Sequence, residues 1–178
     1  MKIEMYTDGG CIGNGKDPNA PGGLGVAIYI DGQLICKYSR QLFEKPNTNQ
    51  KSELYAAIDG LTLINEVIRP KYFNNDFIQT TVILYSDSTY VINGITDWIR
   101  GWKNNGWINS KKEPVANKNL WLMLDAIVEL LKSNNIIIHW TKVKGHSGNA
   151  GNELVDSLAK GAMYGEEVND VFNYWNNQ

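Results

Sequence analysis

The sequence predicts an α/β domain in which a β-hairpin feeds a partly parallel sheet. Two alternating apolar runs flank Asp31-Gly32, a pair that is typical of a tight hairpin turn. A short apolar run over 80–85 suits a buried parallel strand, and apolar residues at helical spacing recur elsewhere. With 178 residues and 43% hydrophobic content, the chain can bury one substantial core, so a single domain is expected.

The first part of the chain predicts three strands. Residues 2–7 alternate and then break at Asp8-Gly9-Gly10, so we expect a strand that ends at the Asp8 carboxylate. The stretch 11–23 contains Gly, Asn, Asp and Pro and predicts a loop. Strands are expected over 24–30 and 34–42, because both runs are apolar and alternating.

A helix and a buried strand follow the hairpin. Apolar residues at helical spacing predict a helix over 47–67, with Thr48 or Asn49 as its cap. The run TTVILY at 80–85 then predicts a strand that leads into Ser86-Asp87-Ser88.

The second half of the chain completes the order βββαβααβα. Short helices are expected over 89–98, followed by a polar segment over 100–117 that is rich in Gly, Asn and Lys. An amphipathic pattern predicts a helix over 119–133, then a strand over 136–143 and a last helix over 152–163.

Charge and cysteine content narrow the class of protein. The formal charge of −2 argues against a polybasic nucleic-acid coat but leaves room for a local basic patch. Cys11 and Cys36 are too few for a disulfide framework, and we expect free thiols in a reducing cytoplasm. No signal-peptide pattern or membrane-length apolar run is present, so a cytoplasmic protein without membrane association is expected.

Four carboxylates stand where expected elements begin or end. They are Asp8, Glu53, Asp87 and Asp156. Mg²⁺ prefers oxygen ligands, and two ions can clamp an attacking and a leaving oxygen, so the set suits metal-assisted phosphate chemistry. Each residue taken alone also has a structural interpretation: an Asp before Gly favours a turn, and Asp156 can form an i,i+4 ion pair with Lys160.

These residues lie within blocks that resemble type 1 ribonuclease H, the cellular enzyme that hydrolyses the RNA strand of RNA–DNA hybrids. The blocks come in the family's order and are YTDGGCIGN (6–14), TNQKSELYAAIDGL (48–61), YSDSTYVINGITDWIRGWKNNGW (85–107), EPVANKNLW (113–121) and KVKGHSGNAGNELVDSLAK (142–160). The resemblance implies a catalytic domain over 1–164 with a five-stranded mixed sheet flanked by helices. The remaining tail, 165–178, is expected either to dock on this domain or to be disordered.

The same resemblance assigns chemical roles. Asp8, Glu53, Asp87 and Asp156 would hold two Mg²⁺ (or Mn²⁺) ions at the scissile phosphate, one activating the water and the other stabilising the departing oxygen. Cleavage would leave 5′-phosphate and 3′-hydroxyl ends. His146 occupies the family's mobile-loop position, where glycines on both sides permit motion, and is expected to take part in proton transfer or product release.

The resemblance also assigns residues to the two strands of a hybrid. Asn14, Asn49 and Gln50 would lie near RNA 2′-hydroxyls, which an amide can meet as donor or acceptor. On the DNA side, Thr48 and Asn117 match a phosphate pocket, and the strand channel is matched by Trp98, Trp102 and Ser110. As alternatives, Asn14 is a turn residue, Asn49 a helix cap, and the tryptophans belong to the core. Of the two tryptophans, we expect Trp102 to be more exposed than Trp98.

The chain has fewer positive charges at the expected substrate-binding positions than the family's pattern. Pro46 stands where relatives often carry arginine, with Lys45 beside it, and the basic loop retains only Arg100, Lys103, Lys111, Lys112 and Lys118. Each missing phosphate contact lowers the slope of log affinity against log salt by about 0.9. We therefore expect weak, weakly salt-dependent hybrid binding. Low processivity is also expected, because no hybrid-binding module precedes Met1.

Two rival functions are disfavoured. A resolvase or integrase core would share the acidic cluster but lack the TNQKSE and GITDWIRGW blocks, and a catalytically dead hybrid-binding module would be expected to lose a carboxylate. The expected protein is a metal-dependent endoribonuclease that acts on RNA–DNA hybrids as a monomer, without an obligate protein partner.

Overall fold

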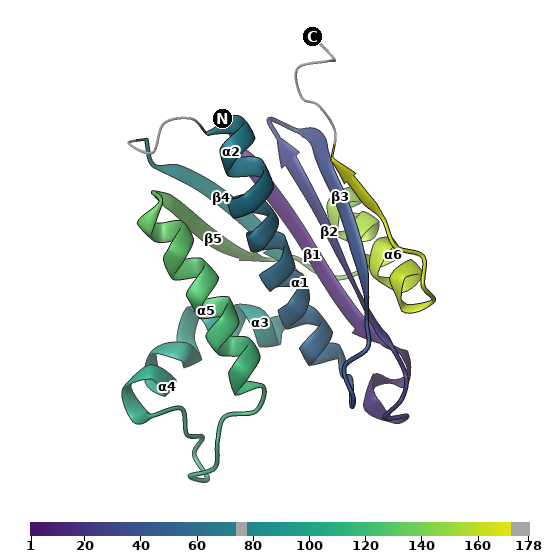
Figure 1. The fold of residues 1–178 in the computed structure, drawn as a ribbon, viewed down its shortest axis with the longest axis vertical. Coiled ribbons are helices and arrows are strands. Elements are labelled where there is room, and N and C mark those ends of the chain that lie inside the picture. The colour runs from purple at the N-terminus through teal and green to yellow at the C-terminus, as the bar shows by residue number, and fades with distance from the viewer. Residues whose placement is uncertain (74–77, 172–178) are drawn as a thin grey trace.

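A computed structural model describes residues 1–73 and 78–171 of the chain. A single mixed sheet crosses the molecule in the order β5-β4-β1-β2-β3-β6 (Figure 1). β1 pairs in parallel with β4, and β4 with β5, whereas β1, β2, β3 and β6 are successively antiparallel. The strands are β1 (Ile3–Cys11), β2 (Gly22–Ile30), β3 (Gln33–Leu42), β4 (Thr80–Ser86), β5 (Ile136–Lys142) and β6 (Asn169–Val171).

Helices cover both faces of the sheet. α1 and α5 lie together over one face, and α6 packs on the other face against β1, β2 and β3 (Figure 1). The core between α1, α5 and the sheet is apolar and includes the fully buried Trp121. The helical elements are a 3₁₀ turn (Ile12–Gly15), α1 (Asn49–Leu63), a π-turn (Ile64–Ile68), α2 (Arg69–Tyr72), α3 (Thr89–Asn93), a second π-turn (Gly94–Trp98), α4 (Ile99–Asn105), α5 (Lys118–Ser133) and α6 (Ala150–Met163).

The sequence prediction of an α/β fold with a mixed sheet is confirmed. Asp31 and Gly32 both have positive φ, 49° and 82°, as a two-residue hairpin turn with the twist of its strands requires. β4 is parallel to both of its neighbours, as its apolar run indicated. Thr48 caps α1, because its hydroxyl accepts a hydrogen bond from the Lys51 N–H at 3.2 Å.

Three features of the fold differ from the expectation by more than a shift of one or two residues at the end of an element. β1 does not end at Asp8 but continues to Cys11, because β2 goes on pairing with it as far as Gly22. The segment expected to be irregular from residue 100 begins with α4, which ends at Gly106 in a left-handed conformation. The sheet has a sixth strand, β6, which covers the outer edge of β3. A three-residue strand gives too short a pattern to be recognised in sequence.

Two further features of the structure concern the state of the cysteines and the character of the helices. Cys11 and Cys36 are both buried and free. Across residues 1–73 and 78–171, no helix combines the length and the apolar character needed to cross a membrane.

Candidate active site

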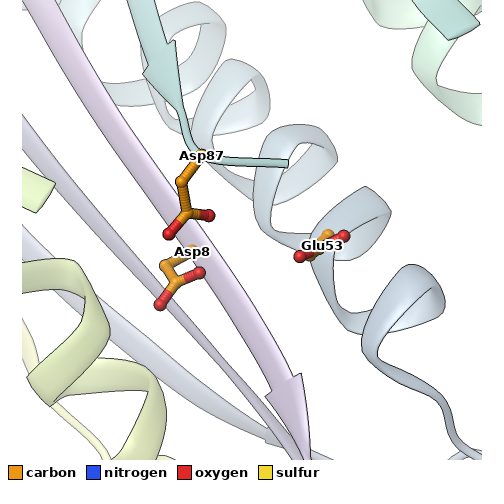
Figure 2. Close-up of side chains that lie close together, drawn as sticks. All are labelled: Asp8, Glu53 and Asp87. Atoms are coloured by element: carbon orange, nitrogen blue, oxygen red, sulfur yellow. The ribbon is translucent and has the colours of Figure 1, made fainter. Parts of the chain in front are cut away.

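Three carboxylates from separate parts of the chain converge beside the sheet. Asp8 lies on β1, Asp87 directly follows β4, and Glu53 lies on α1. One oxygen from each falls within 4.8 Å of those of the other two, and all three residues are partly exposed. Figure 2 shows Asp87 directly above Asp8, with Glu53 beside them on its helix. The fold therefore joins three of the four carboxylates that the sequence singled out.

The end of the parallel pairing between β1 and β4 explains how Asp8 and Asp87 meet. The last paired residues are Tyr6 and Tyr85, whose rings stack with centroids 4.7 Å apart. Alternate residues of a strand share a face, so Asp8 and Asp87 follow two residues later on the same side. β4 ends at Ser86, so Asp87 lies just beyond the strand and its carboxylate lies beside that of Asp8.

A glycine lets Glu53 approach the two aspartates. The Cα of Gly9 packs against the backbone of Ser52 and Glu53, so closely that a Cβ would collide with both. α1 thus contacts β1 backbone to backbone, one residue after Asp8. Any residue other than glycine at position 9 would force helix and strand apart.

Ser88 fixes the orientation of the Glu53 side chain. Its hydroxyl donates a 2.6 Å hydrogen bond to Oε2 of Glu53 and accepts one of 3.1 Å from the Val91 N–H, which caps α3. Ser88 is buried. Sequence reasoning missed this role, although a serine directly after Asp87 at a helix start was the available signal.

The fourth carboxylate, Asp156, lies near this cluster but outside it. α6 rests directly on β2 at Gly25, the residue paired with Asp8, and this contact brings Asp156 close enough for its charge to act on Asp8. The Asp156 carboxylate accepts a 2.7 Å hydrogen bond from Nζ of Lys160. The i,i+4 ion pair, which the sequence left open, is present.

Burial and mutual repulsion hold protons on the cluster. Desolvation, followed by the charges of Asp87 and Asp156, raises the pKa of Asp8 to about 8. Desolvation also raises the pKa of Glu53, against the hydrogen bond from Ser88, which lowers it. A bound cation would relieve both effects, and an all-oxygen donor set suits a hard divalent ion such as Mg²⁺. The residues therefore fit a metal site.

His146 lies on an exposed loop next to the cluster. Its backbone has a positive φ of 55°, and Ser147 braces the loop by donating a 2.6 Å hydrogen bond to the carbonyl of Lys144. The neighbouring Gly145 passes Asp87 so closely that a Cβ would lie 3.1 Å from Oδ2. The imidazole therefore belongs to a turn that passes beside the Asp87 carboxylate.

Two asparagines expected on the RNA side are hydrogen-bonded into one unit. Oδ1 of Asn14 accepts a 3.0 Å bond from the Asn49 N–H, and Oδ1 of Asn49 accepts one of 2.8 Å from the Cys11 N–H. Each amide uses its oxygen inside the protein, so its NH₂ group is what it can offer a ligand. Asn14 is also the turn residue foreseen from sequence, with φ of 48°. Gln50 is exposed on the first turn of α1.

A cavity of about 500 Å³ opens between the starts of α1 and α5. Its polar lining includes Lys51, Asn117, Lys118 and Asn119. The Asn117 amide also donates a 3.1 Å hydrogen bond to the Tyr90 hydroxyl. Thr48 is not among the residues that line this cavity, and its hydroxyl is engaged as the cap of α1. Lys118 was expected as a cation of the basic loop, whereas Lys51 is a cation of this cavity that sequence reasoning missed.

The tryptophans form one aromatic cluster. Trp102 lies 5.9 Å from Trp98 and 5.3 Å from Trp121 between ring centroids. The expectation that Trp102 is the more exposed of the pair is wrong: Trp98 is 39% exposed, whereas Trp102 is half-buried, because it packs on Trp107 and Trp121 as well. Ser110 is exposed in the loop after α4.

One of the few cations expected to contact the DNA strand forms an ion pair within the protein. Nζ of Lys103 lies 2.7 Å from Oδ1 of Asp125 on α5. The structure therefore leaves this surface with less free positive charge than the sequence implied.

Comparisons with known proteins agree on a family. The family model described as RNase H matches residues 1–164. A protein named Ribonuclease H from Legionella pneumophila (strain Corby) is 43% identical over 159 residues, which are 89% of this chain and 94% of the relative.

Solved structures share the fold. LC9-RNase H1, described as a type 1 RNase H, superposes with a TM-score of 0.70 at 26% identity, over 99% of this chain and 81% of the other. LC11-RNase H1, solved in complex with an RNA/DNA hybrid, superposes with a TM-score of 0.59 at 23% identity, over 91% and 99% of the two chains.

Proposed function

The chain belongs to the ribonuclease H family, and on that premise we propose that it is a metal-dependent endoribonuclease that hydrolyses the RNA strand of RNA–DNA hybrids. The observation that carries the proposal is the meeting of Asp8, Glu53 and Asp87 within 4.8 Å. Relatives named Ribonuclease H and the hybrid complex of LC11-RNase H1 support the choice of substrate.

The chemistry follows from the donor set. Asp8, Glu53, Asp87 and Asp156 would hold two Mg²⁺ or Mn²⁺ ions, with Asp156 exchanging its contact with Lys160 for one of them. When bound, these ions supply an activated water and a counter-charge for the departing oxygen, so that 5′-phosphate and 3′-hydroxyl ends result. An imidazole nitrogen of His146 would move a proton at the mouth of the site.

Substrate choice would come from the surfaces on either side of the carboxylates. The NH₂ groups of Asn14 and Asn49, with Gln50, would donate to RNA 2′-hydroxyls. On the DNA side, Asn117 would hold a phosphate at the cavity, where Lys51 and Lys118 would supply the charge, and Thr48 would contact the phosphate from the N-cap of α1.

The DNA channel would be formed by Trp98, Trp102 and Ser110. Flat rings can pack on deoxyribose, whereas a ribose would bury its 2′-hydroxyl there without a partner. The exposed face of Trp98 makes it the main contact.

The assembly and location proposed are a monomer in the cytoplasm. The three clustered carboxylates all come from one chain, so one copy can carry the site. Cys11 and Cys36 are free, which fits a reducing compartment.

A charge-neutral variant tests the proposed site. Asp87→Asn should abolish cleavage of a labelled hybrid while hybrid binding persists, because the amide keeps the shape but not the charge. Asp170→Asn, on β6 at the opposite edge of the sheet, is the matched control and should cleave normally. Near-normal cleavage by Asp87→Asn would refute the assignment.

A further inference from the structure

Behind the turn that begins α1 lies an asparagine with no exposed surface. Asn47 is 0% exposed, whereas the residues that follow it, Thr48 and Asn49, are half-buried and Gln50 is exposed. A fully buried amide is tolerated when its polar atoms are hydrogen-bonded. Its hydrogen bonds therefore show what this side chain does.

The Asn47 side chain ties the turn to the sheet. Its Oδ1 accepts hydrogen bonds from the Thr48 N–H at 2.9 Å and from the Ser52 hydroxyl at 3.3 Å. Its Nδ2 donates to the carbonyl of Leu42, the last residue of β3, at 3.4 Å. Gly22 on β2 packs against this network so closely that a Cβ would collide with Asn47 and Ser52.

Asn47 also lies next to the proposed RNA-facing residues. Asn49 is bonded through its N–H to Asn14 and through its side chain to Cys11 on β1. Gly15, in the same turn as Asn14, packs against the carbonyl oxygen of Asn47. Asn47 thus stands between the sheet and both segments that carry the asparagines.

The metal cluster has separate supports. Glu53 is placed by the packing of Gly9 on the backbone of Ser52 and Glu53 and by the hydrogen bond from Ser88, whereas Asn47 meets this turn of α1 through the Ser52 side chain. Loss of the Asn47 amide should therefore disturb recognition of the substrate more than the chemistry on it.

We propose that Asn47 is a positioning residue that places the amide side chains that contact the 2′-hydroxyls of the RNA strand. It accepts a hydrogen bond from the Thr48 N–H and so holds the start of α1, with Asn49 and Gln50, in place beside the carboxylates. This inference rests on the proposed function, because it assumes that these residues face the substrate.

An isosteric pair of variants tests the inference. Asn47→Leu keeps the shape of the side chain and removes its three hydrogen bonds, whereas Asn47→Asp keeps the acceptor for the Thr48 N–H and removes the donor to the Leu42 carbonyl. Ser52→Ala is the matched control, since it removes one equally buried hydroxyl from the same network. Hydrolysis of a short hybrid is measured well below each variant's unfolding temperature, with kcat and KM determined separately.

The expected result is a split between the two constants. Asn47→Leu should raise KM about tenfold and change kcat less than about twofold, because misplacement of binding groups by an ångström can cost up to about 100-fold. It should also lessen the penalty for replacing the ribose at the cleavage point by deoxyribose. Ser52→Ala should keep KM within about twofold of wild type, because Asn47 keeps its hydrogen bonds with the Thr48 N–H and the Leu42 carbonyl. Asn47→Asp, which loses the donor to Leu42, should raise KM in the same direction as Asn47→Leu.

The two possible failures are distinguishable. If the wild type does not cut the hybrid, the proposed function fails. If the wild type cuts it but Asn47→Leu keeps a normal KM and deoxyribose penalty, only the role of Asn47 is refuted. Should Asn47→Leu not fold, a KM for Asn47→Asp within about twofold of wild type would refute it, because that variant also lacks the hydrogen bond to Leu42.

Discussion

The hydroxyl of Ser88 is bonded to Glu53 and to the first turn of α3 at the same time. It donates to Oε2 of Glu53 at 2.6 Å and accepts from the Val91 N–H at 3.1 Å. The residue after one candidate metal ligand, Asp87, therefore orients another. The cluster is held together by a hydrogen bond as well as by the fold.

Replacing Ser88 should weaken both the metal site and the start of α3. Ser88→Ala removes the donor to Glu53 and the cap of α3, so we expect about tenfold weaker metal activation and a stability loss of about 1 kcal/mol. Ser88→Thr retains the hydroxyl and should restore both. Activity as a function of Mg²⁺ concentration, with urea unfolding in parallel, measures the two effects; an unchanged Mg²⁺ midpoint in Ser88→Ala would contradict the role on Glu53.

The pKa of Asp8 predicts a pH-dependent stability. In the folded protein this pKa is about 8, against an ordinary value of 3.8 for the carboxyl group. The native state thus binds more protons than the unfolded chain between these values, and without metal its stability should fall as pH rises through them. We expect a loss on the order of 3 kcal/mol, because a tenfold change in proton affinity is worth about 1.4 kcal/mol and neighbouring carboxylates share the effect.

Urea unfolding in EDTA at pH 5.5 and pH 8 checks this dependence. Asp8→Asn cannot ionise and should show a flatter profile, while Mg²⁺ should restore stability to the wild type at pH 8. A wild-type profile as flat as that of Asp8→Asn would contradict the raised pKa.

Gly9 should be intolerant of any side chain. Gly9→Ala would push α1 away from β1, so we expect a loss of more than about 2 kcal/mol together with most of the activity. Gly101→Ala is the control, because nothing lies within 4 Å of its Cβ position in α4. That variant should gain up to about 1 kcal/mol from helix propensity. Equal stabilities of the two variants, measured by thermal unfolding, would argue against the close approach.

Freeing one lysine should strengthen hybrid binding. Asp125→Asn removes the partner of Lys103 and makes its charge available to a phosphate. We expect tighter binding and a slope of log affinity against log salt that is steeper by about 0.9. Asp170→Asn, whose partner Lys37 lies on β3, should leave the slope unchanged. A wild-type slope of six contacts or more would overturn the expectation of weak salt dependence.

Most elements of the fold could be predicted from the sequence because their signals are local. Asp31-Gly32 predicts a hairpin from two adjacent residues, and the apolar run over 80–85 predicts a buried parallel strand from its own composition. The end of β1 was misplaced because Gly9 and Gly10 look like a turn, yet pairing with β2 holds them in the strand. That pairing depends on a partner distant in sequence.

Site geometry was predictable only in part. The carboxylates were found because motifs place them, but their distances are set by contacts such as Gly9 on α1, which no spacing reveals. The exposure of Trp98 relative to Trp102 depends on Trp107 and Trp121, which meet Trp102 only in the folded chain. Ser88 and Asn47 likewise acquire their roles from partners 35 and 5 residues away.

Strand-specific cleavage tests the central claim most directly. RNA–DNA, RNA–RNA and DNA–DNA duplexes, each with either strand labelled, are incubated with the protein in Mg²⁺ or in EDTA. We predict cleavage of the RNA strand of the hybrid alone, and only in Mg²⁺. Cleavage of the DNA–DNA duplex, or of any duplex in EDTA, would contradict the account.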